Sequence, residues 1–582
     1  MQLYVERMSK FNLKLICTTD LHMELFGYDY LSDTEIENRG LLKLIPQIRQ
    51  ERRGQNAILF DNGDFLQGTP LADELIQSDN HYLATIFNDL SYDAITLGNH
   101  DFDYGLDALS AFLAKLEIPV VSANVSKFSD DVVPSLILDR TFYDLDGFES
   151  TIRIGVLGLL PPQTTHWNAH SLRGDVEFHD IVKTAEAEAQ NLKNQGADIV
   201  VALAHTGLDQ NPPKDMMENA IEPLSHLDNL DLIVGGHTHE WFSSEGNETS
   251  SRLGPVPVIQ AGSHGQGFGV VEMTLAPGPK WRVTCARSRL VKTKANTVPV
   301  GLPAGVSSAH QEVRHRLAEP IGRSSRPLSN HFSSIGFDDG VKLVHQALLD
   351  CVDDALPNLG MPKSACFTSF RSDGVFGSKN FLNTEDLVIR QRDLESVVPF
   401  NNPICAIEST ALQLRTWIAK SSEFFNSVDP VSASTPLRNK SIPAYFFDQF
   451  SDVTYEIDLS KDTARPKERV PQLRLDGRDL DDDEPIAIIA TTYRAYGGGG
   501  FVFTKQNQTI WESQQGIRDI VAQYLSKIGS FEPDGDPLWT FTSTPGAKVT
   551  FALPQPCAST PSLEGLAIVN ENDKEQYFEL EL

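Results

Sequence analysis

The chain has 582 residues, of which 40% are hydrophobic, and it carries a formal net charge of −30. This length exceeds that of one ordinary domain, so we expect two large domains with substantial cores. The acidic balance argues against binding long nucleic acid, which needs a basic surface, but it leaves small phosphate substrates open. No apolar run reaches the roughly 18 residues of a membrane span, so the sequence predicts no membrane partner.

The N-terminal stretch does not have the composition of a secretory signal. A secretory signal requires an apolar core, and here charged residues interrupt it. These residues are Glu6, Arg7, Lys10 and Lys14. The apolar residues that follow are better explained as the first core strand, and Met8 is an alternative start. These observations predict a cytoplasmic protein. They predict nothing about its oligomeric state.

The six cysteines are scattered along the chain and form no CxxC pair. This spacing favours reduced, mostly buried thiols, as in a cytosolic protein. A single cross-link between Cys351 and Cys366 stays open as an alternative.

From about residue 11 to residue 300, strand-like runs alternate with amphipathic helical segments, which is typical of an α/β domain. The spacing predicts helices over Gly40–Arg53 and Asp180–Gln195, the second with Asp180 as N-cap and Gly196 just past its end. The expected strands are Leu13–Thr19, Ala57–Phe60, Ala94–Leu97, Thr151–Leu160, Ile199–Ala204, Leu232–Val234 and Val256–Gln260.

Residues 301–325 have the composition of a linker. Gly301, Pro303 and Gly305 interrupt regular structure, and a helix is expected over Ala309–Ala318. Residues 326–582 then form a second domain of mixed α and β character. Its expected elements are helices over Val341–Cys351 and Thr410–Ser421, a strand over Pro485–Thr491, and surface loops over Asp458–Arg469 and Asp476–Asp483.

Carboxylate, amide and imidazole side chains follow five of the predicted strands, at the point where each strand ends. In α/β proteins this edge of the sheet is where ligands bind. Asp, Asn and His together suit a pair of divalent metal ions, so the sequence predicts a two-metal hydrolase. The residues are Asp20, His22, Asp64, Asn99, His100, His205, His237 and His239.

The local spacing supports this interpretation. Alternate residues of an extended chain share a face, so Asp20 with His22, and His237 with His239, can each approach one ion. The two oxygens of Asp64 could bridge two ions. Each motif alone has an ordinary structural explanation as a turn or surface residue; the conjunction of all five favours the metal site. His264, in a glycine-rich loop, completes no motif and is assigned no role.

The ordered motifs D-x-H, GD, GNHD, a single H and GHTH resemble those of the calcineurin-like metallophosphoesterases. The longer segments DNGDFLQGTPLAD, LGNHDFDYG and VGGHTHEWF resemble the 5′-nucleotidase family. In the C-terminal half, VVPFNNPICAIESTALQLRTWI, DVTYEID and ATTYRAYGGGGF resemble its 2′,3′-cyclic-nucleotide 2′-phosphodiesterase/3′-nucleotidase branch. The resemblance implies an α/β fold: an N-terminal metallophosphoesterase β-sandwich flanked by helices over residues 11–300, and a mixed α/β nucleotide-binding domain over residues 326–582.

The resemblance also implies roles for individual residues. One metal is held by Asp20, His22, Asp64 and His239, and the second by Asp64, Asn99, His205 and His237. His100 is the catalytic histidine, and Asp103 is its orienting partner. Asp101 stands where the family more often has Glu and receives no direct role. The ions suit Mn, Zn, Fe or Co.

In the C-terminal domain the resemblance implies a nucleotide-binding pocket. Phe400 and Tyr496 would stack on the base, and Arg371 would contact the phosphate or sugar. Two other functions remain open: a 5′-nucleotidase or nucleotide-sugar hydrolase with the same metal set, and a non-catalytic nucleotide-binding protein on the same fold. Because the branch is typically exported, a periplasmic location is the alternative to the cytoplasm.

Overall fold

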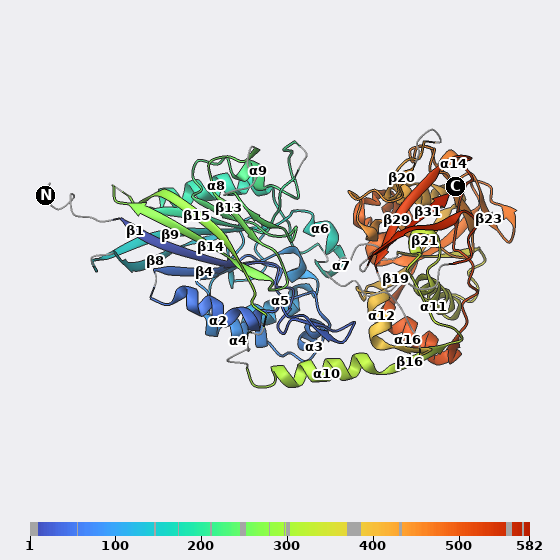
Figure 1. Ribbon diagram of the computed structural model, residues 1–582, viewed down its shortest axis with the longest axis horizontal. Helices are drawn as coiled ribbons and strands as arrows, with labels where there is room; N and C mark the ends of the chain where they lie inside the picture. The colour runs from blue at the N-terminus through green and yellow to red at the C-terminus, as the bar shows by residue number, and fades with distance from the viewer. Residues whose placement is uncertain are drawn as a thin grey trace. The chain divides into compact units, whose positions relative to one another are not determined.

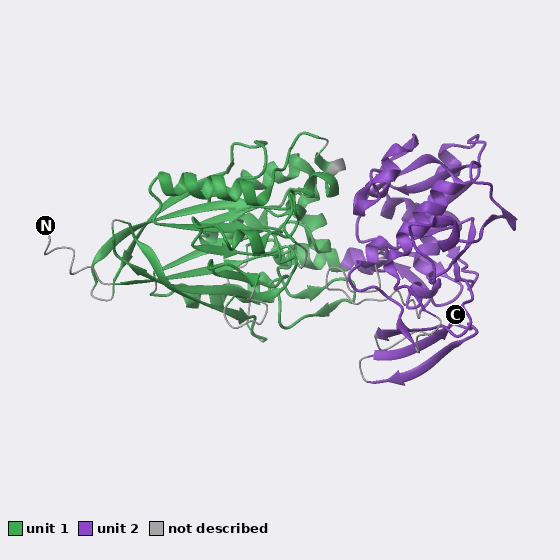
Figure 2. Ribbon diagram, turned by 90° about the horizontal axis from the view of Figure 1, so that it is seen from above, with its two compact units in different colours: residues 1–314 green, residues 315–582 purple. Residues whose placement is uncertain are grey.

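The computed structural model describes residues 10–54, 56–144, 147–172, 174–209, 212–244, 252–278, 280–295, 297, 303–368, 386–429, 434–554, 561–572 and 575–582. The chain divides into two compact units, Met1–Arg314 and His315–Leu582, which Figure 2 shows in different colours. Each unit has its own hydrophobic core, as expected for a chain of this length.

Unit 1 is a sandwich of two mixed sheets (Figure 1). The first sheet has the order β15 (Arg282–Lys292), β14 (Gly267–Ala276), β1 (Phe11–Thr18), β4 (Ala57–Asp61), β5 (Ala94–Thr96), β6 (Val120–Val121) and β7 (Val132–Val133). The second has the order β12 (Trp241–Ser243), β13 (Val258–Ala261), β11 (Leu232–Val234), β10 (Ile199–Ala204), β9 (Glu149–Leu159) and β8 (Ser135–Tyr143).

The core of unit 1 lies between the two sheets. Leu15 and Phe60 from the first sheet pack with Ile154, Val201 and Leu203 from the second, all fully buried. Strands β1, β4 and β5 are parallel, as are β9, β10 and β11. Parallel pairing brings the carboxyl ends of these strands to the same edge of each sheet.

Helices cover the outer faces of the sandwich. On the second sheet, Ala185, Ala189 and Leu192 of α8 (Ile181–Asn194) pack against Val200 and Ala202. Figure 1 shows α2 (Leu41–Arg52), α4 (Tyr82–Leu90) and α5 (Gly105–Leu113) on the side of the first sheet. The remaining helices of unit 1 are α3 (Pro70–Gln77), α6 (Thr164–Trp167), α7 (Ala169–Leu172), α9 (Ile221–Leu224) and the start of α10 (Val306–Ala318).

Unit 2 is built around a five-stranded sheet in the order β21 (Asp448–Phe450), β17 (Lys363–Thr368), β25 (Pro485–Thr491), β19 (Pro403–Thr410) and β26 (Thr509–Gly516). Its core contains residues of α11 (Asp339–Ala355), α12 (Gln391–Val397) and α16 (Ile517–Ile528) in one cluster. A second cluster contains α13 (Ala411–Ser421) with many aromatic residues. None of the helices within the described residues has both the length and the apolarity needed to cross a membrane.

Smaller sheets complete unit 2. One contains β18 (Val388–Arg390), β16 (Pro320–Ser324) and β27 (Ser530–Phe531). Another contains β20 (Thr435–Pro436), β29 (Lys548–Pro554), β31 (Glu575–Glu581) and β30 (Leu566–Glu571). A third contains β24 (Arg478–Asp479), β23 (Leu473–Leu475), β22 (Thr454–Ile457) and β28 (Thr540–Phe541). Two helix-flanked units of these types confirm the predicted fold class.

Several predicted elements are confirmed in detail. Asp180 caps α8, since its carboxylate accepts the backbone N–H of Lys183 at 2.9 Å. The strand expected over Pro485–Thr491 is β25. Two helices are longer than expected: α10 begins at Val306, and α11 extends over Asp339–Ala355 because Asp338 caps it.

The two expected surface loops of unit 2 are partly wrong. The first ends in a short helix, α14 (Pro466–Arg469), in which Arg469 is buried and donates hydrogen bonds to Ser422 and to the carbonyl of Asp458. The second contains strand β24, whose Asp479 pairs with Arg474. A high density of charged residues therefore did not distinguish surface loops from segments that form a helix or pair in a sheet. The alternative cross-link is also wrong, because Cys351 and Cys366 are free thiols.

We expect unit 2 to lose stability in acid through His345. Its Nε2 lies 3.0 Å from the carbonyl of Gln449, and burial lowers the pKa of its imidazole to about 3. The unfolded chain takes up a proton near about pH 6.5, whereas the folded chain does so only near pH 3. Stability is therefore lost as the pH falls through this window. Urea unfolding at pH 7.5 and 5.5 should show a smaller loss for His345→Gln than for wild type, by about 1 kcal/mol.

The matched control is His315→Gln, because His315 is exposed. It should follow wild type at both pH values. Identical pH dependence in His345→Gln and wild type would contradict the assignment.

Candidate metal centre

The predicted ligands lie where the strands of the two sheets end. The loop after β1 is joined to the loop after β4 by backbone hydrogen bonds from Asp20 N–H to the carbonyl of Gly63 and from His22 N–H to that of Asp64, both 2.9 Å. The loop after β11 reaches the first sheet, because the N–H of His237 donates to Oδ1 of Asp20 at 3.0 Å. These bonds bring ligands from both sheets to one end of the sandwich.

The backbone at these positions is strained. A positive φ is uncommon for residues other than glycine, and clusters of such residues occur at functional sites. Five of the predicted ligands adopt it: Asp20 (52°), His22 (48°), Asp64 (57°), His237 (72°) and His239 (58°). The neighbouring Gly98 is also required, because a Cβ there would lie 2.2 Å from Oδ1 of Asp64.

The first group of candidate ligand atoms belongs to Asp20, His22 and His239, which lie within 4.8 Å of one another. Nε2 of His22 is 3.0 Å from Nε2 of His239, which in turn is 3.5 Å from Oδ1 of Asp20. Burial, with His239 nearby, holds the pKa of His22 well below its ordinary value, so its imidazole is neutral. A neutral imidazole nitrogen facing a carboxylate oxygen is a suitable donor pair for a divalent ion.

The second group belongs to Asp64, His205 and His237, within the same 4.8 Å limit. Oδ2 of Asp64 lies 3.0 Å from Nε2 of His205 and 3.9 Å from Nε2 of His22 in the first group. One carboxylate oxygen is thus within reach of an imidazole from each group. This is the placement expected for a residue that bridges two ions.

Three buried polar atoms at this place make no well-aligned hydrogen bond, although the first and last lie 3.0 Å apart: Oδ2 of Asp64, Oδ1 of Asn99 and Nε2 of His205. Leaving such atoms unpaired costs about 1–3 kcal/mol each, so native proteins rarely do so without a reason. Oδ2 of Asp64 and Nε2 of His205 belong to the second group, and Asn99 precedes His100, whose N–H donates to Asp64. The donor set therefore fits a pair of divalent metal ions.

The outward nitrogens of the imidazoles are held by hydrogen bonds. Nδ1 of His22 lies 2.8 Å from the carbonyl of Gln67, and Nδ1 of His205 lies 2.8 Å from that of Asn62. Each Nδ1 must donate to its carbonyl, so in the neutral imidazole it is Nε2 that carries the lone pair and faces the ligand groups. Such outer contacts are typical of metal-binding histidines.

His237 has the reverse arrangement. Its Nε2 lies 2.9 Å from Oε1 of Glu218, so Nδ1 is the nitrogen left for an ion. The ring of Trp167 stacks on this imidazole with centroids 5.5 Å apart. The sequence motifs gave no signal for Glu218 or Trp167.

His100 lies beside the carboxylate of Asp64. Its backbone N–H donates to Oδ1 of Asp64 at 2.8 Å, and its Nδ1 is 2.7 Å from Oδ2 of Asp103. Burial alone would lower the pKa of His100, but the carboxylates of Asp103 and Asp64 outweigh it and raise that pKa to about 9. With the protein groups alone, His100 is a protonated imidazolium at neutral pH.

Two protein-family models match different parts of the chain. The calcineurin-like phosphoesterase model matches residues 13–241, and the 5′-nucleotidase, C-terminal domain model matches residues 341–506. The protein is a calcineurin-like phosphoesterase with a 5′-nucleotidase C-terminal domain. The family implies hydrolysis of phosphoesters with divalent metal ions, which agrees with the donor set described above.

Curated relatives cover most of this phosphoesterase. It is 26% identical over 605 residues to the trifunctional nucleotide phosphoesterase protein YfkN of Bacillus subtilis, an alignment that spans 97% of this chain and 41% of that longer protein. It is 28% identical over 593 residues to a 2′,3′-cyclic-nucleotide 2′-phosphodiesterase/3′-nucleotidase of Haemophilus influenzae, covering 92% of this chain and 88% of the relative.

The crystal structure of a proposed 5′-nucleotidase from Staphylococcus aureus has the same two-unit fold. It superposes with a TM-score of 0.73 at 22% identity and covers 91% of this chain and 99% of the other. At 22% identity, this similarity establishes the fold alone.

Asp101 of the phosphoesterase supports the loop that carries Asp64. Its two buried oxygens accept four backbone N–H groups, from Gly98, Asp64, Phe65 and Leu66, at 2.8–3.0 Å. The carboxylate therefore binds the loop after β5 to the loop after β4. The sequence motif of Asp101 indicated no direct role, and the structure shows an indirect one.

His264 also lies at the site, although its sequence motif gave it no role. Its ring stacks on His22 with centroids 5.0 Å apart, and its backbone N–H donates to the carbonyl of Asp20 at 2.7 Å. The glycines around it, Gly262 and Gly265, both have positive φ and allow the loop to turn there. These glycines were the feature of the sequence that could have indicated a special role for the loop of His264.

The predicted substrate-binding residues belong to unit 2. Ile404 of β19 pairs with Thr491 of β25, so Phe400 before β19 and Tyr496 after β25 lie at neighbouring strand ends. Phe400 is half-buried, while Tyr496 is 37% exposed and donates its hydroxyl to Glu512 at 2.6 Å. Their stacking role stays a prediction. Arg371 lies outside the described residues.

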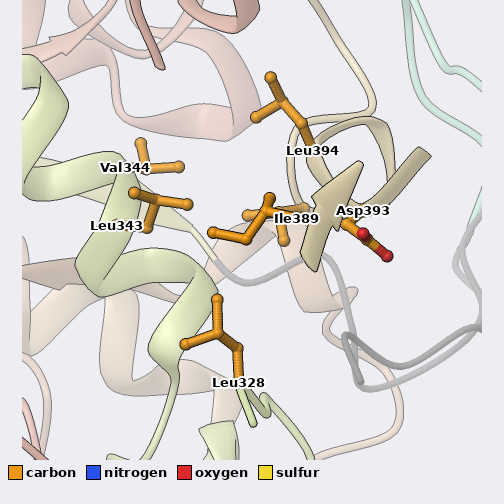
Figure 3. Close-up of a pocket in the computed structure, with 7 residues that line it drawn as sticks. Leu328, Leu343, Val344, Ile389, Asp393 and Leu394 are labelled. Carbon is orange, nitrogen blue, oxygen red and sulfur yellow. The ribbon is translucent and has the colours of Figure 1, made fainter. Parts of the chain in front are cut away.

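A small pocket in unit 2 has a different character. Figure 3 shows that Leu343 and Val344 of α11 face Ile389 and Leu394 across it. The lining is apolar apart from Asp393, whose carboxylate accepts the N–H of Arg390. With no convergent polar groups in its lining, it has the features of a packing gap.

We predict that Asp64→Asn weakens metal binding at both positions, because Oδ2 of Asp64 faces an imidazole of each group. Titration of the metal-free protein with Mn²⁺ should show two ions bound per wild-type chain. The variant should bind both more weakly, with an affinity lower by about 10-fold or more. Asp107→Asn, at an exposed position in α5, is the control and should bind like wild type. Unchanged stoichiometry and affinity in Asp64→Asn would contradict the bridging assignment.

Asp101→Asn should destabilise the metal-free protein. An amide keeps one acceptor oxygen, so two of the four buried N–H groups would face an NH2 group, at a cost of about 1–3 kcal/mol for each lost bond. The thermal unfolding midpoint of the metal-free variant should fall by several degrees relative to wild type and to Asp107→Asn. An unchanged midpoint would show that the loops are held by other contacts.

Proposed function

We propose that this phosphoesterase converts 2′,3′-cyclic nucleotides to 3′-nucleotides and then removes the 3′-phosphate to leave a nucleoside. The observation that supports the hydrolytic step is the convergence of two ligand groups on Asp64, with His100 directly beside it. The choice of substrate is supported by the names of relatives that align over about nine-tenths of the chain.

The two ions, when bound, supply positive charge to the phosphoryl group and lower the pKa of a water molecule that attacks phosphorus. The residues that would hold them are Asp20, His22, Asp64 and His239 for one, and Asp64, Asn99, His205 and His237 for the other. The mixed carboxylate, amide and imidazole set suits Mn, Zn, Fe or Co.

His100 would act on the leaving oxygen. In the first step the bond from phosphorus to the 2′-oxygen breaks, and in the second the bond to the 3′-oxygen breaks. Each leaving oxygen is an alkoxide and needs a proton. A protonated His100, oriented by Asp103 through Nδ1, can donate that proton from Nε2. The same site serves both steps because each is the attack of water on phosphorus with a ribose oxygen leaving.

Unit 2 would bind the base. Aromatic rings stack on nucleobases for about 1–3 kcal/mol each and tolerate different bases, which favours broad specificity. Tyr496 is exposed and its loop is supported by Arg494, which is buried, pairs with Asp448 at 2.8 Å and donates to the carbonyl of Gly498.

A 5′-nucleotidase activity is the second candidate. It is favoured by the C-terminal domain family and by relatives of that name at 24% identity. The metal ligands would be the same, so only the substrate distinguishes the two.

The decisive assay measures phosphate release with Mn²⁺ from 3′-AMP and 5′-AMP, and ring opening of 2′,3′-cyclic AMP. Turnover of the cyclic nucleotide and 3′-AMP is expected, with His100→Ala lowering kcat by about 10²–10⁴-fold. His166→Ala, at an exposed position in unit 1, is the control.

Turnover of 5′-AMP alone would instead assign a 5′-nucleotidase. No turnover of these nucleotides or of p-nitrophenyl phosphate would favour a non-catalytic nucleotide-binding protein.

A further inference from the structure

A third residue completes a chain of hydrogen bonds that begins at His100. Oδ2 of Asp103 faces Nδ1 of His100 at 2.7 Å, while Oδ1 of the same carboxylate accepts Nδ2 of Asn168 at 2.5 Å. Asn168 is 5% exposed, so its amide is shielded from water. Both oxygens of Asp103 are therefore engaged, one by the imidazole and the other by the amide.

The segment around Asn168 is fixed by its own contacts. Asn168 follows α6, where its N–H donates to the carbonyl of Thr164 at 3.0 Å, and its carbonyl accepts the N–H of Leu172 at 2.8 Å. Ser171 donates its hydroxyl to the backbone carbonyl of Asp103 at 2.9 Å. The segment thus contacts Asp103 through both its side chain and its backbone.

The same segment also reaches the second ligand group. Trp167, next to Asn168, stacks on His237. Gln163, at the start of α6, donates to the carbonyl of Met216, two residues before the Glu218 that binds His237. Residues 163–171 therefore contact the partner of His100 and an imidazole of the candidate metal centre at once.

We propose that Asn168 is a positioning residue for the reaction, which orients the Asp103 carboxylate and, through it, the imidazole of His100. This inference rests on the proposed function, in which His100 donates a proton. A carboxylate can rotate about its Cβ–Cγ bond and can present either oxygen. Because Asn168 occupies Oδ1, Oδ2 faces His100, and the imidazole presents Nε2 to the substrate side. An orienting group behind a catalytic histidine has this role in other hydrolases.

The competing explanation is that Asn168 only stabilises the turn between α6 and α7. A structural residue of that kind would affect folding and would act independently of Asp103. A positioning residue acts through Asp103, so its effect must disappear when Asp103 is removed. A double-mutant cycle separates the two explanations.

The test uses the metal-loaded full chain and 2′,3′-cyclic AMP. The variants are Asn168→Asp, Asn168→Ala, Asp103→Ala and the double variant Asp103→Ala with Asn168→Ala. Asn168→Asp keeps the shape of the side chain but removes the N–H donor and faces Asp103 with a like charge. It should lower kcat about tenfold or more, with KM changed less than about twofold. In the Asp103→Ala background, Asn168→Ala should change kcat less than about twofold.

His166→Ala, at an exposed position in the preceding helix α6, should leave kcat unchanged. Thermal midpoints show whether each variant is folded, and Asn168→Asp keeps the test valid if the alanine variant is not. Equal fold-losses from Asn168→Ala with and without Asp103, or unchanged kcat in Asn168→Asp, would overturn this inference while leaving the proposed function standing. An inactive wild type would overturn both.

Discussion

The candidate site depends on one buried carboxylate, that of Asp64. Its Oδ1 accepts the N–H of His100, and its Oδ2 faces His205 and His22. Burial would raise the pKa of Asp64, but the imidazoles of His205 and His100 outweigh burial and hold that pKa well below its ordinary value. Asp64 is therefore charged, and it links the two ligand groups to His100.

A charged group this deeply buried requires a supporting structure. The backbone at Asp64 has positive φ, and its N–H is bound by Asp101. Gly98 leaves room for the carboxylate, since any side chain there would collide with it. Strain of this kind, about 1–3 kcal/mol for each such residue, persists only where the surroundings determine the geometry, and here Asp101 supplies four of the hydrogen bonds that do so.

Unit 2 also contains buried charged groups, in the ion pair of Arg494 and Asp448, but there they support a loop. Arg494 and Asp448 are both nearly inaccessible, and Asp448 also accepts the indole N–H of Trp417 at 2.7 Å. The guanidinium lies over the ring of Phe501, 4.2 Å from its centroid. Breaking such a pair leaves an uncompensated buried charge, so its geometry is strongly held. The pair supports the glycine-rich turn beside Tyr496. The loop proposed to bind the nucleobase is therefore held in a fixed position.

Much of this arrangement was predictable from the sequence because it depends on local patterns. Buried apolar runs predicted the strands, the residues directly after them predicted the ligands, and parallel strands place such ends at one edge. Asp180 and Gly196 marked the ends of α8 for the same local reason. The resemblance of the segment LGNHDFDYG to the 5′-nucleotidase family implied that His100 and Asp103, three residues apart, are partners, and they are in contact.

Other features depended on the packing of segments distant in the sequence. Asn168 contacts Asp103, Glu218 contacts His237, and His264 stacks on His22, although no spacing connects these pairs. The charged composition of Asp458–Arg469 likewise predicted a surface loop, whereas Arg469 is buried. The sequence by itself determined which donors stand at the strand ends, because strand pattern and turn chemistry are local. Only the tertiary structure decided which side chains orient those donors, because that depends on how the two sheets and their loops pack together.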